Sequence, residues 1–207
     1  MKKNILLPQY SESAAEAGID EAGRGCLAGP VVAAAVVLPP DFAPPLLTDS
    51  KQLTHKQREV LRIEILREAI GWGVGIISPQ RIDEINILNA TYEAMHEAVG
   101  ALMRGAGISP DFLAIDGNRF RPLGEIPFAC IIKGDGKLRN IAAASVLAKT
   151  FRDDVMLDLH AIEPHFGWNT NKGYPTADHR NAIRKYGISI HHRRSFTLLP
   201  ENEWTLF

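Results

Sequence analysis

Five short apolar runs constrain the fold of this 207-residue chain more than any other feature. Each run is bounded by glycine, proline or polar residues, a pattern that is typical of strands in the core of a sheet. The first two runs are joined by a turn at Gly23-Arg24-Gly25, which predicts an antiparallel pair. The runs cover residues 17–21, 31–38, 72–77, 112–115 and 128–132.

Helical signals lie between and after these runs. Thr54 and Gln57 have the spacing of a capping box, which predicts a helix that extends to Ile70. Ser78-Pro79 predicts a helix start, with helix continuing through residues 89–103. An Ala- and Leu-rich stretch without glycine or proline predicts a long helix over residues 141–159, and Thr176 is a candidate cap for a last helix over 177–186.

Strands interspersed with helices, with an antiparallel opening, indicate an α/β fold built on a mixed five-stranded sheet flanked by helices, with a short helical C-terminal region. No low-complexity linker divides the chain, so we expect residues 1–207 to form one domain with its core at about residues 15–196 and a short tail. We also expect a monomer.

Composition excludes several classes of protein. Apolar residues make up 45% of the chain, and no apolar run approaches the roughly 18 residues that a membrane-spanning helix needs. The first residues do not resemble a secretory signal, so we expect a cytoplasmic protein with no membrane association. Cys26 and Cys130 have no CxxC or histidine partner at ligand spacing, which favours buried thiols over a zinc site or a disulfide.

Positive charge is concentrated locally although the formal net charge is −1. Residues 172–194 contain six Lys or Arg against one acid, and residues 133–152 contain five against one. Such runs either bind a polyanion or form an ordinary solvated surface, and charge alone does not choose between the two. We interpret His191-His192 as part of a basic surface element.

Four acidic residues follow or end the apolar runs. Asp20 and Glu21 end the first, Asp116 ends the fourth, and Asp135 closely follows the fifth. Taken singly, Asp116-Gly117 and Asp135-Gly136 are also common turn sequences. Neighbouring residues on a strand face opposite sides, so Asp20 and Glu21 share a site only if the strand twists or breaks, which the glycines after them make plausible.

Acids gathered at one sheet edge repel one another unless cations compensate. Oxygen ligands suit Mg²⁺ or Mn²⁺, and two such ions about 4 Å apart activate a water and stabilise the leaving oxygen of a phosphodiester. Nearby cations would then neutralise a nucleic-acid backbone, and the candidates are Arg24, Lys51, Lys133 and Lys149.

Three other motifs are incomplete. The spacing Gly23-x-Gly25-x-x-Ala28 resembles a dinucleotide fingerprint, but Pro30 follows where a helix is needed. The segment that starts at Gly134 lacks the Ser/Thr of a phosphate-binding loop. Ser145 has no nucleophile-elbow context, so a hydrolase triad is unsupported.

Taken in order, the segments resemble the ribonuclease HII family from residue 18 to about residue 196. The matching segments are Gly18-Ile19-Asp20-Glu21-Ala22-Gly23-Arg24-Gly25, Ala28-Gly29-Pro30-Val31-Val32, Thr48-Asp49-Ser50-Lys51-Gln52-Leu53, Ile77-Ser78-Pro79 through Ile82-Asp83, Asn86-Ile87-Leu88-Asn89-Ala90-Thr91, Asp116-Gly117-Asn118, Lys133-Gly134-Asp135, residues 142–149, and Gly173-Tyr174-Pro175-Thr176 with His179.

The resemblance implies a ribonuclease H-like fold and an endonuclease that cuts the RNA strand of RNA–DNA hybrids, and ribonucleotides embedded in duplex DNA, with two Mn²⁺ or Mg²⁺ ions. It implies 3′-hydroxyl and 5′-phosphate products. Its catalytic and metal-binding positions fall on Asp20, Glu21, Asp116 and Asp135. It further implies that Gly23, Arg24, Gly25 and Tyr174 inspect the ribonucleotide and that Lys51, Ser145 and Lys149 hold phosphates.

Two other functions remain open at this stage: a two-metal DNA nuclease or junction resolvase, and a non-catalytic nucleic-acid-binding module. The first differs in having no need for a 2′-hydroxyl, and the second has no need for four acids beside a polyanion. The tail Glu203-Trp204-Thr205-Leu206-Phe207 resembles the sliding-clamp-binding pattern Gln-Leu-x-Leu-Phe, although an apolar terminus packed on its own domain is the simpler interpretation.

Overall fold

A computed structural model describes residues 6–48 and 50–199. Its centre is a five-stranded sheet in the order β3-β2-β1-β4-β5. The first three strands in the chain pair antiparallel, whereas β1, β4 and β5 are parallel, so the predicted mixed sheet and antiparallel opening are confirmed. The strands are β1 (Glu16–Ala22), β2 (Val31–Val37), β3 (Gly71–Ile77), β4 (Phe112–Asp116) and β5 (Phe128–Ile131).

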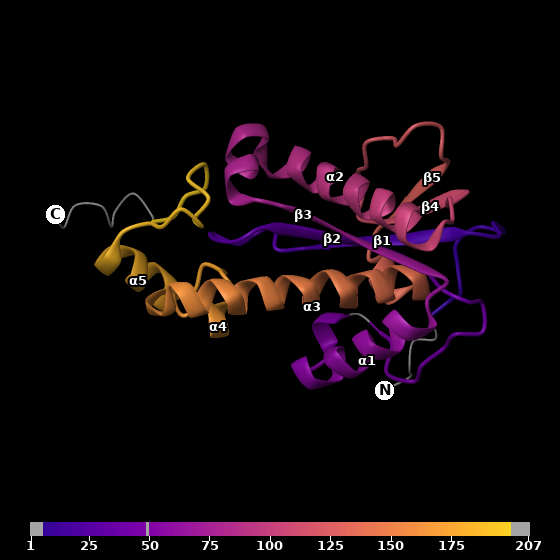
Figure 1. Ribbon diagram of the computed structural model, residues 1–207, viewed down its shortest axis with the longest axis horizontal. Coiled ribbons are helices and arrows are strands. Elements are labelled where there is room, and N and C mark those ends of the chain that lie inside the picture. The colour runs from indigo at the N-terminus through magenta and orange to yellow at the C-terminus, as the bar shows by residue number, and fades with distance from the viewer. Residues whose placement is uncertain (1–5, 49, 200–207) are drawn as a thin grey trace.

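Helices cover both faces of the sheet, as Figure 1 shows, with α2 (Pro79–Ala106) on one face and α3 (Arg139–Ile162) and α1 (His55–Glu68) on the other. β2 is buried along its whole length because of this double cover. Ala33 and Ala35 pack in the apolar cluster beneath α2, whereas Ala34 and Val36 pack in the cluster beneath α3.

Glycines in β3 let α2 lie unusually close to the sheet. A Cβ at Gly73 would lie 2.2 Å from the carbonyl oxygen of Ala98, and one at Gly75 would lie 2.1 Å from that of Ala94. The helix backbone therefore occupies the space that side chains would fill on this face of the strand.

The predicted helix starts are confirmed. Thr54 and Gln57 form a reciprocal capping box, with the Thr54 amide 2.8 Å from the Gln57 side-chain oxygen. Ser78 caps α2 with proline directly after it, and Thr176 caps α5 (Ala177–Tyr186). One feature of α2 departs from the expected continuous helix: Asn86 has φ 66°, and its side chain accepts hydrogen bonds from the amides of Leu88 and Asn89.

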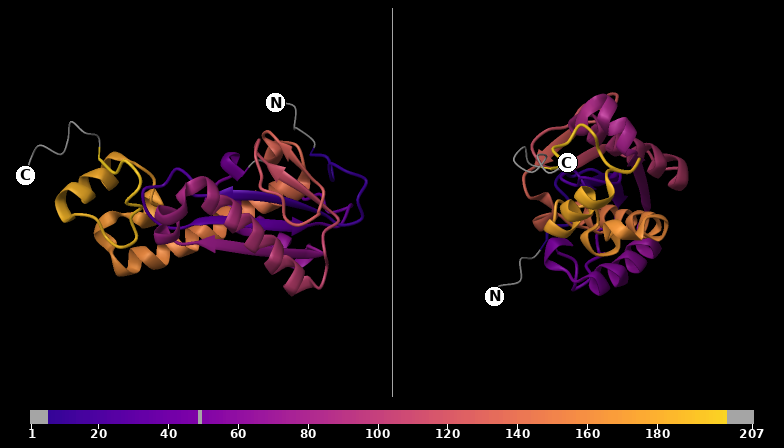
Figure 2. Two further views of the ribbon diagram at one scale, coloured as in Figure 1. Left: turned by 90° about the horizontal axis from the view of Figure 1, so that it is seen from above. Right: turned by 90° about the vertical axis from the view of Figure 1, so that its left-hand side faces the viewer.

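The C-terminal part of the described chain forms a second packing unit at one end of the sheet. α3 continues past the sheet, and η3 (Pro164–Phe166), α4 (Trp168–Asn171) and α5 gather around its far end, as the left view of Figure 2 shows. Their apolar cluster includes Leu27 from the turn after β1. The short helices η1 (Ser50–Gln52) and η2 (Gly134–Gly136) complete the described elements.

His191-His192 is not the surface element that the sequence predicted. His191 is partly buried and His192 is buried, so the prediction is wrong for His192, and Arg193 directly after it is fully buried as well. Their burial follows from the cover that α4 and the residue 26–30 segment place over them. Of the two free cysteines, Cys26 is buried as expected and Cys130 is only partly buried. Within residues 6–48 and 50–199, no helix is long and apolar enough to cross a bilayer.

Candidate active site

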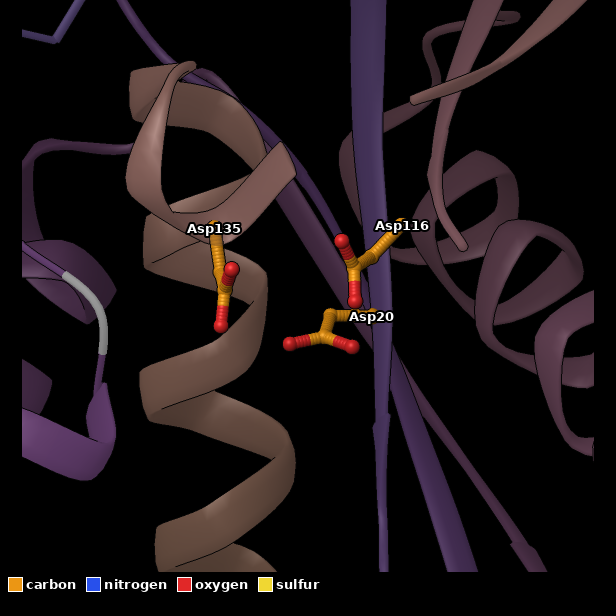
Figure 3. Close-up of side chains that lie close together, drawn as sticks. All are labelled: Asp20, Asp116 and Asp135. Atoms are coloured by element: carbon orange, nitrogen blue, oxygen red, sulfur yellow. The ribbon is translucent and has the colours of Figure 1, made fainter. Parts of the chain in front are cut away.

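Three aspartates from three elements meet at one edge of the sheet. Asp20 lies on β1, Asp116 ends the neighbouring parallel strand β4, and Asp135 lies in η2 just after β5. Parallel neighbours end at the same edge, which is why residues far apart in sequence converge here. Each offers a carboxylate oxygen within 4.8 Å of the others, and Figure 3 shows the three side chains directed into one space.

Glu21 lies on the other face of β1 from Asp20. The strand does not break between them: Asp20 pairs with Ala34 and Glu21 with Ala33 in regular register, and the turn begins only at Gly23. Glu21 therefore stands beside the three aspartates rather than among them, and its carboxylate accepts a hydrogen bond from the Arg24 guanidinium at 3.1 Å.

The electrostatics of the site favour a bound cation. Burial raises the pKa of Asp20 well above its usual value, and the charges of Glu21 and Asp116 raise it further. Burial also raises the pKa values of Glu21 and Asp116. Divalent cations would offset both desolvation and repulsion, and an all-oxygen donor set fits Mg²⁺ or Mn²⁺. Lys51 compensates in part, with its Nζ 3.1 Å from Asp135.

A hollow of about 280 Å³ opens above the aspartates. It gathers ten of the eleven site residues expected from the sequence, and the eleventh, Asp135, reaches it through its ion pair with Lys51. The ten are Asp20, Glu21, Gly23, Arg24, Gly25, Lys51, Asp116, Ser145, Lys149 and Tyr174.

Ser145 and Lys149, like Arg24 and Lys51, already have partners inside the protein. Ser145 is buried, shares a hydrogen bond of 2.8 Å with the Ser50 hydroxyl and bonds to Asp20. Lys149 forms an ion pair with Asp153 one turn further along α3. Ser145 therefore supports Asp20, and the contact of Ser145 and Lys149 with phosphate stays a prediction.

A second hollow of about 320 Å³, which was not predicted from the sequence, shares Glu21, Arg24 and Asp116 with the first. The remaining lining residues come from α2 and from the segment after β4. They are Leu88, Thr91, Tyr92, Met95, Gly117, Asn118 and Arg119. Thr91 and Asn118 lie in two of the segments that resemble the family, and this resemblance was the sequence signal for the second hollow. Only the fold shows that these two segments lie next to each other. Ser50 and Arg58, which line the first hollow, were likewise not assigned.

Residues 17–199 match the family profile described as Ribonuclease HII. The chain belongs to the ribonuclease HII family. Among curated relatives, Ribonuclease HII of Porphyromonas gingivalis is 58% identical over 193 residues, which cover 93% of this chain and 94% of that protein. Ribonuclease HII of Bacteroides thetaiotaomicron is 55% identical over 202 residues, which cover 98% and 99%.

Solved structures of ribonuclease HII and H2 proteins share the fold. The ribonuclease H2 of Pyrococcus horikoshii OT3 superposes with a TM-score of 0.72 at 28% identity, covering 89% of this chain and 94% of that one. The ribonuclease HII of Archaeoglobus fulgidus, solved in a complex with PCNA, has a TM-score of 0.72 at 27% identity, covering 90% and 97%. The predicted ribonuclease H-like fold is therefore confirmed.

Membership of the ribonuclease HII family establishes the class of reaction. This chain is a metal-dependent endoribonuclease, a hydrolase that cuts the RNA of RNA–DNA hybrids. The alternative of a non-catalytic binding module is excluded. The three clustered aspartates agree with the divalent-metal dependence of the family.

Proposed function

We propose that Asp20, Asp116 and Asp135, with Glu21 beside them, bind two Mg²⁺ or Mn²⁺ ions and catalyse cleavage both in RNA–DNA hybrids and at single ribonucleotides in duplex DNA. The observation that carries the proposal is the meeting of three carboxylates within 4.8 Å of one another, two of them lining a hollow that the Gly23–Gly25 turn and Tyr174 also line. Divalent ions held there would supply an activated water and stabilise the leaving 3′ oxygen, leaving 3′-hydroxyl and 5′-phosphate ends.

Recognition of the ribose falls to groups of the protein that line the first hollow. Gly23 has φ 91° and Gly25 has open space where a Cβ would stand, so main-chain amides and carbonyls of this turn can approach a ribose closely. Tyr174 presents a partly exposed ring to the same hollow. The 2′-hydroxyl is the group that distinguishes RNA from DNA, and we assign its recognition to this turn and to Tyr174.

The path of the cleaved strand follows from the two hollows. They meet at Glu21, Arg24 and Asp116, so a phosphodiester held by the aspartates has space on both sides for its neighbouring nucleotides. Lys51, which is 78% exposed at its side chain, stands at the rim where it can contact a phosphate without being desolvated. Ser145 and Lys149 support the base of the first hollow.

The test compares three labelled substrates under single-turnover conditions: duplex DNA with one ribonucleotide, the same duplex in all-DNA form, and a long RNA–DNA hybrid. We expect cleavage of the first and third with Mg²⁺ or Mn²⁺, none with EDTA, and none of the all-DNA duplex. Cleavage of all-DNA substrate would instead support a DNA nuclease or resolvase. A lone ribonucleotide left uncut while the hybrid is cleaved would disprove the embedded-ribonucleotide activity.

The tail lies outside the described residues, and its role is a separate proposal. Its pattern, together with an Archaeoglobus fulgidus neighbour solved in complex with PCNA, supports binding of residues 203–207 to a sliding clamp. Calorimetric titration of the tail peptide into the clamp of the same organism should show saturable binding that is lost when Leu206 and Phe207 are both changed to alanine. A flat titration with the native peptide would dispose of this partner. A cytoplasmic location and a monomeric state also stay predictions.

A further inference from the structure

Two fully buried arginines lie beneath the glycine turn that we assign to ribose recognition. Arg152 projects from α3 and is 1% exposed, and Arg193 comes from the C-terminal segment and is 0% exposed. A guanidinium is rarely buried so completely unless its donors are satisfied, and it cannot lose its charge to reduce the penalty. Their hydrogen-bond partners therefore show what the two side chains hold in place.

The bonds from Arg152 go to main-chain carbonyls of two separate segments. Its Nε donates to Pro30 at 3.0 Å and one terminal nitrogen donates to Ala28 at 3.1 Å, both just after the glycine turn. The other terminal nitrogen donates to Lys172 at 2.8 Å, two residues before Tyr174. One rigid planar group thus fixes three carbonyls in a single geometry.

Arg152 also touches the two recognition elements themselves. A Cβ at Gly23 would lie 2.0 Å from the Arg152 Nε, so the glycine is needed there for the turn to rest on the guanidinium. On the other side, the guanidinium carbon lies 5.9 Å from the centre of the Tyr174 ring, within the range of a cation–π contact. The Arg152 side chain therefore stands between the turn and the aromatic ring.

Arg193 reinforces only one of these two segments. It donates to the carbonyls of Arg24 at 2.9 Å and Gly29 at 3.0 Å, and its guanidinium carbon lies 5.2 Å from the Phe196 ring. Among the described residues, a main-chain bond from the Leu27 amide to the Gly173 carbonyl at 2.8 Å also joins the two segments. Arg152 differs in contacting both recognition elements directly.

We propose that Arg152 is a positioning residue that sets the spacing between the Gly23–Gly25 turn and Tyr174, and through that spacing the enzyme's preference for a lone ribonucleotide. The proposal rests on the proposed function, in which these two elements read the ribose. A lone ribonucleotide must be recognised in one register, whereas a long hybrid offers many registers. Misplacement of the two elements therefore slows the first substrate more than the second.

The experiment measures single-turnover rate constants at saturating enzyme on both substrates and compares their ratio. The variants are Arg152→Lys, Tyr174→Ala and the double variant, since lysine keeps the charge but lacks the rigid planar fork of donors that holds the three carbonyls. Arg58→Lys is the matched control, because Arg58 lines the same hollow and donates to carbonyls of Ser50 and Leu53, away from both recognition elements. Circular dichroism establishes that each variant is folded at the assay temperature.

We expect Arg152→Lys and Tyr174→Ala each to lower the ratio of lone-ribonucleotide to hybrid cleavage by about tenfold or more. The double variant should lower it no further than either single change, because Arg152 acts through the position of Tyr174. Arg58→Lys should keep the wild-type ratio even where both rates fall.

Three results would overturn the inference: an unchanged ratio in folded Arg152→Lys, effects that multiply in the double variant, or a ratio that responds to Arg152→Lys but not to Tyr174→Ala. Failure of the proposed function is recognised separately, since the wild-type enzyme would then not cut the lone ribonucleotide. Amide exchange on the wild-type protein provides a test without any variant. If one guanidinium holds both segments, the amides of residues 23–26 and 172–176 become exposed to exchange in the same opening event. Independent exchange of the two segments would contradict the proposal.

Discussion

The metal-binding role of Asp116 can be tested with little disturbance of the fold, because asparagine at this position can keep the hydrogen bond that the carboxylate accepts from the chain. Its Oδ1 accepts a hydrogen bond of 2.7 Å from the Gly134 amide, which anchors the η2 turn that carries Asp135. Asparagine keeps an oxygen at that position and loses only the charge. A change at this residue therefore separates the metal-binding role of the carboxylate from its structural role.

We expect Asp116→Asn to lower the single-turnover cleavage rate by at least about a thousandfold while hybrid binding persists. Asp154→Asn is the control, because Asp154 lies on α3 in a partly buried ion pair with Arg62, away from the aspartate cluster, and this variant should retain wild-type rates. Isothermal titration with Mn²⁺ should show weaker metal binding for Asp116→Asn only. Near wild-type turnover in a preparation free of wild-type enzyme would remove Asp116 from the metal site.

The position of α2 against β3 depends on glycines in the strand, because a glycine has no side chain to keep the helix at a distance. Gly71, Gly73 and Gly75 alternate along one face of the strand, and helix main chain or small side chains occupy the space beside them. The opposite face carries Trp72 and Ile76, which are partly exposed at the edge of the sheet. The close approach of α2 thus depends on three missing side chains.

We expect Gly75→Ala to reduce the free energy of unfolding by about 2–4 kcal/mol, because its Cβ would collide with helix main chain rather than with a flexible side chain. Gly105→Ala is the matched control, because Gly105 lies on α2, the helix that packs against Gly75. Open space surrounds that position, so better helix propensity should stabilise the protein by about 0.5–1 kcal/mol. Urea denaturation measures both. Equal stability of Gly75→Ala and wild type would contradict the close packing.

At the scale of the whole molecule, a buried histidine pair ties the C-terminal unit to the recognition segment. His179 Nδ1 lies 2.9 Å from the Tyr174 carbonyl and therefore carries a proton, while its Nε2 accepts from Trp168 at 3.0 Å. His192 Nδ1 accepts from the Ser189 amide at 3.0 Å, so its proton resides on Nε2, 3.2 Å from His179. Both rings are therefore neutral in the folded protein.

Burial, followed in effect by the neighbouring His179 and His191, lowers the pKa of His192 to about 3. In the unfolded chain His192 has the ordinary pKa near 6.5. As the pH falls below that value, His192 is protonated in the unfolded chain but stays neutral in the folded protein. The free energy of unfolding therefore decreases with falling pH between about 6.5 and 3. This single group contributes a loss on the order of 1–2 kcal/mol between pH 7 and 5.

His192→Gln tests this linkage, since glutamine cannot be protonated in that range. We expect the stability difference between wild type and His192→Gln to narrow as the pH falls from 7 to 5, measured by urea denaturation at each pH. A difference that stays constant across this pH range would show that His192 keeps an ordinary pKa in the folded protein.

Sequence alone determined the features that depend on neighbours along the chain. The capping signals at Thr54, Ser78 and Thr176 are satisfied within three residues, so their helices begin where the pattern predicts. The apolar runs became strands for the same reason, with ends shifted by about one residue. The positions of the acids at or just after the ends of core strands were enough to predict that Asp20, Asp116 and Asp135 can meet at one sheet edge, and the parallel pairing of β1, β4 and β5 explains why they do.

Only the tertiary structure decided which side chains are buried and where regular elements continue or break, because both depend on elements that pack over them. Glu21 lies beside the three aspartates rather than among them because β1 stays regular, although the sequence allowed a break. Asn86 interrupts α2 with a left-handed residue whose side chain replaces the lost amide partners. Arg152, Arg193 and His192 look like surface residues by composition, yet they are buried. Carbonyls of remote segments accept hydrogen bonds from both arginines, and the His179 ring accepts one from His192. A linear pattern does not contain the distances between those segments.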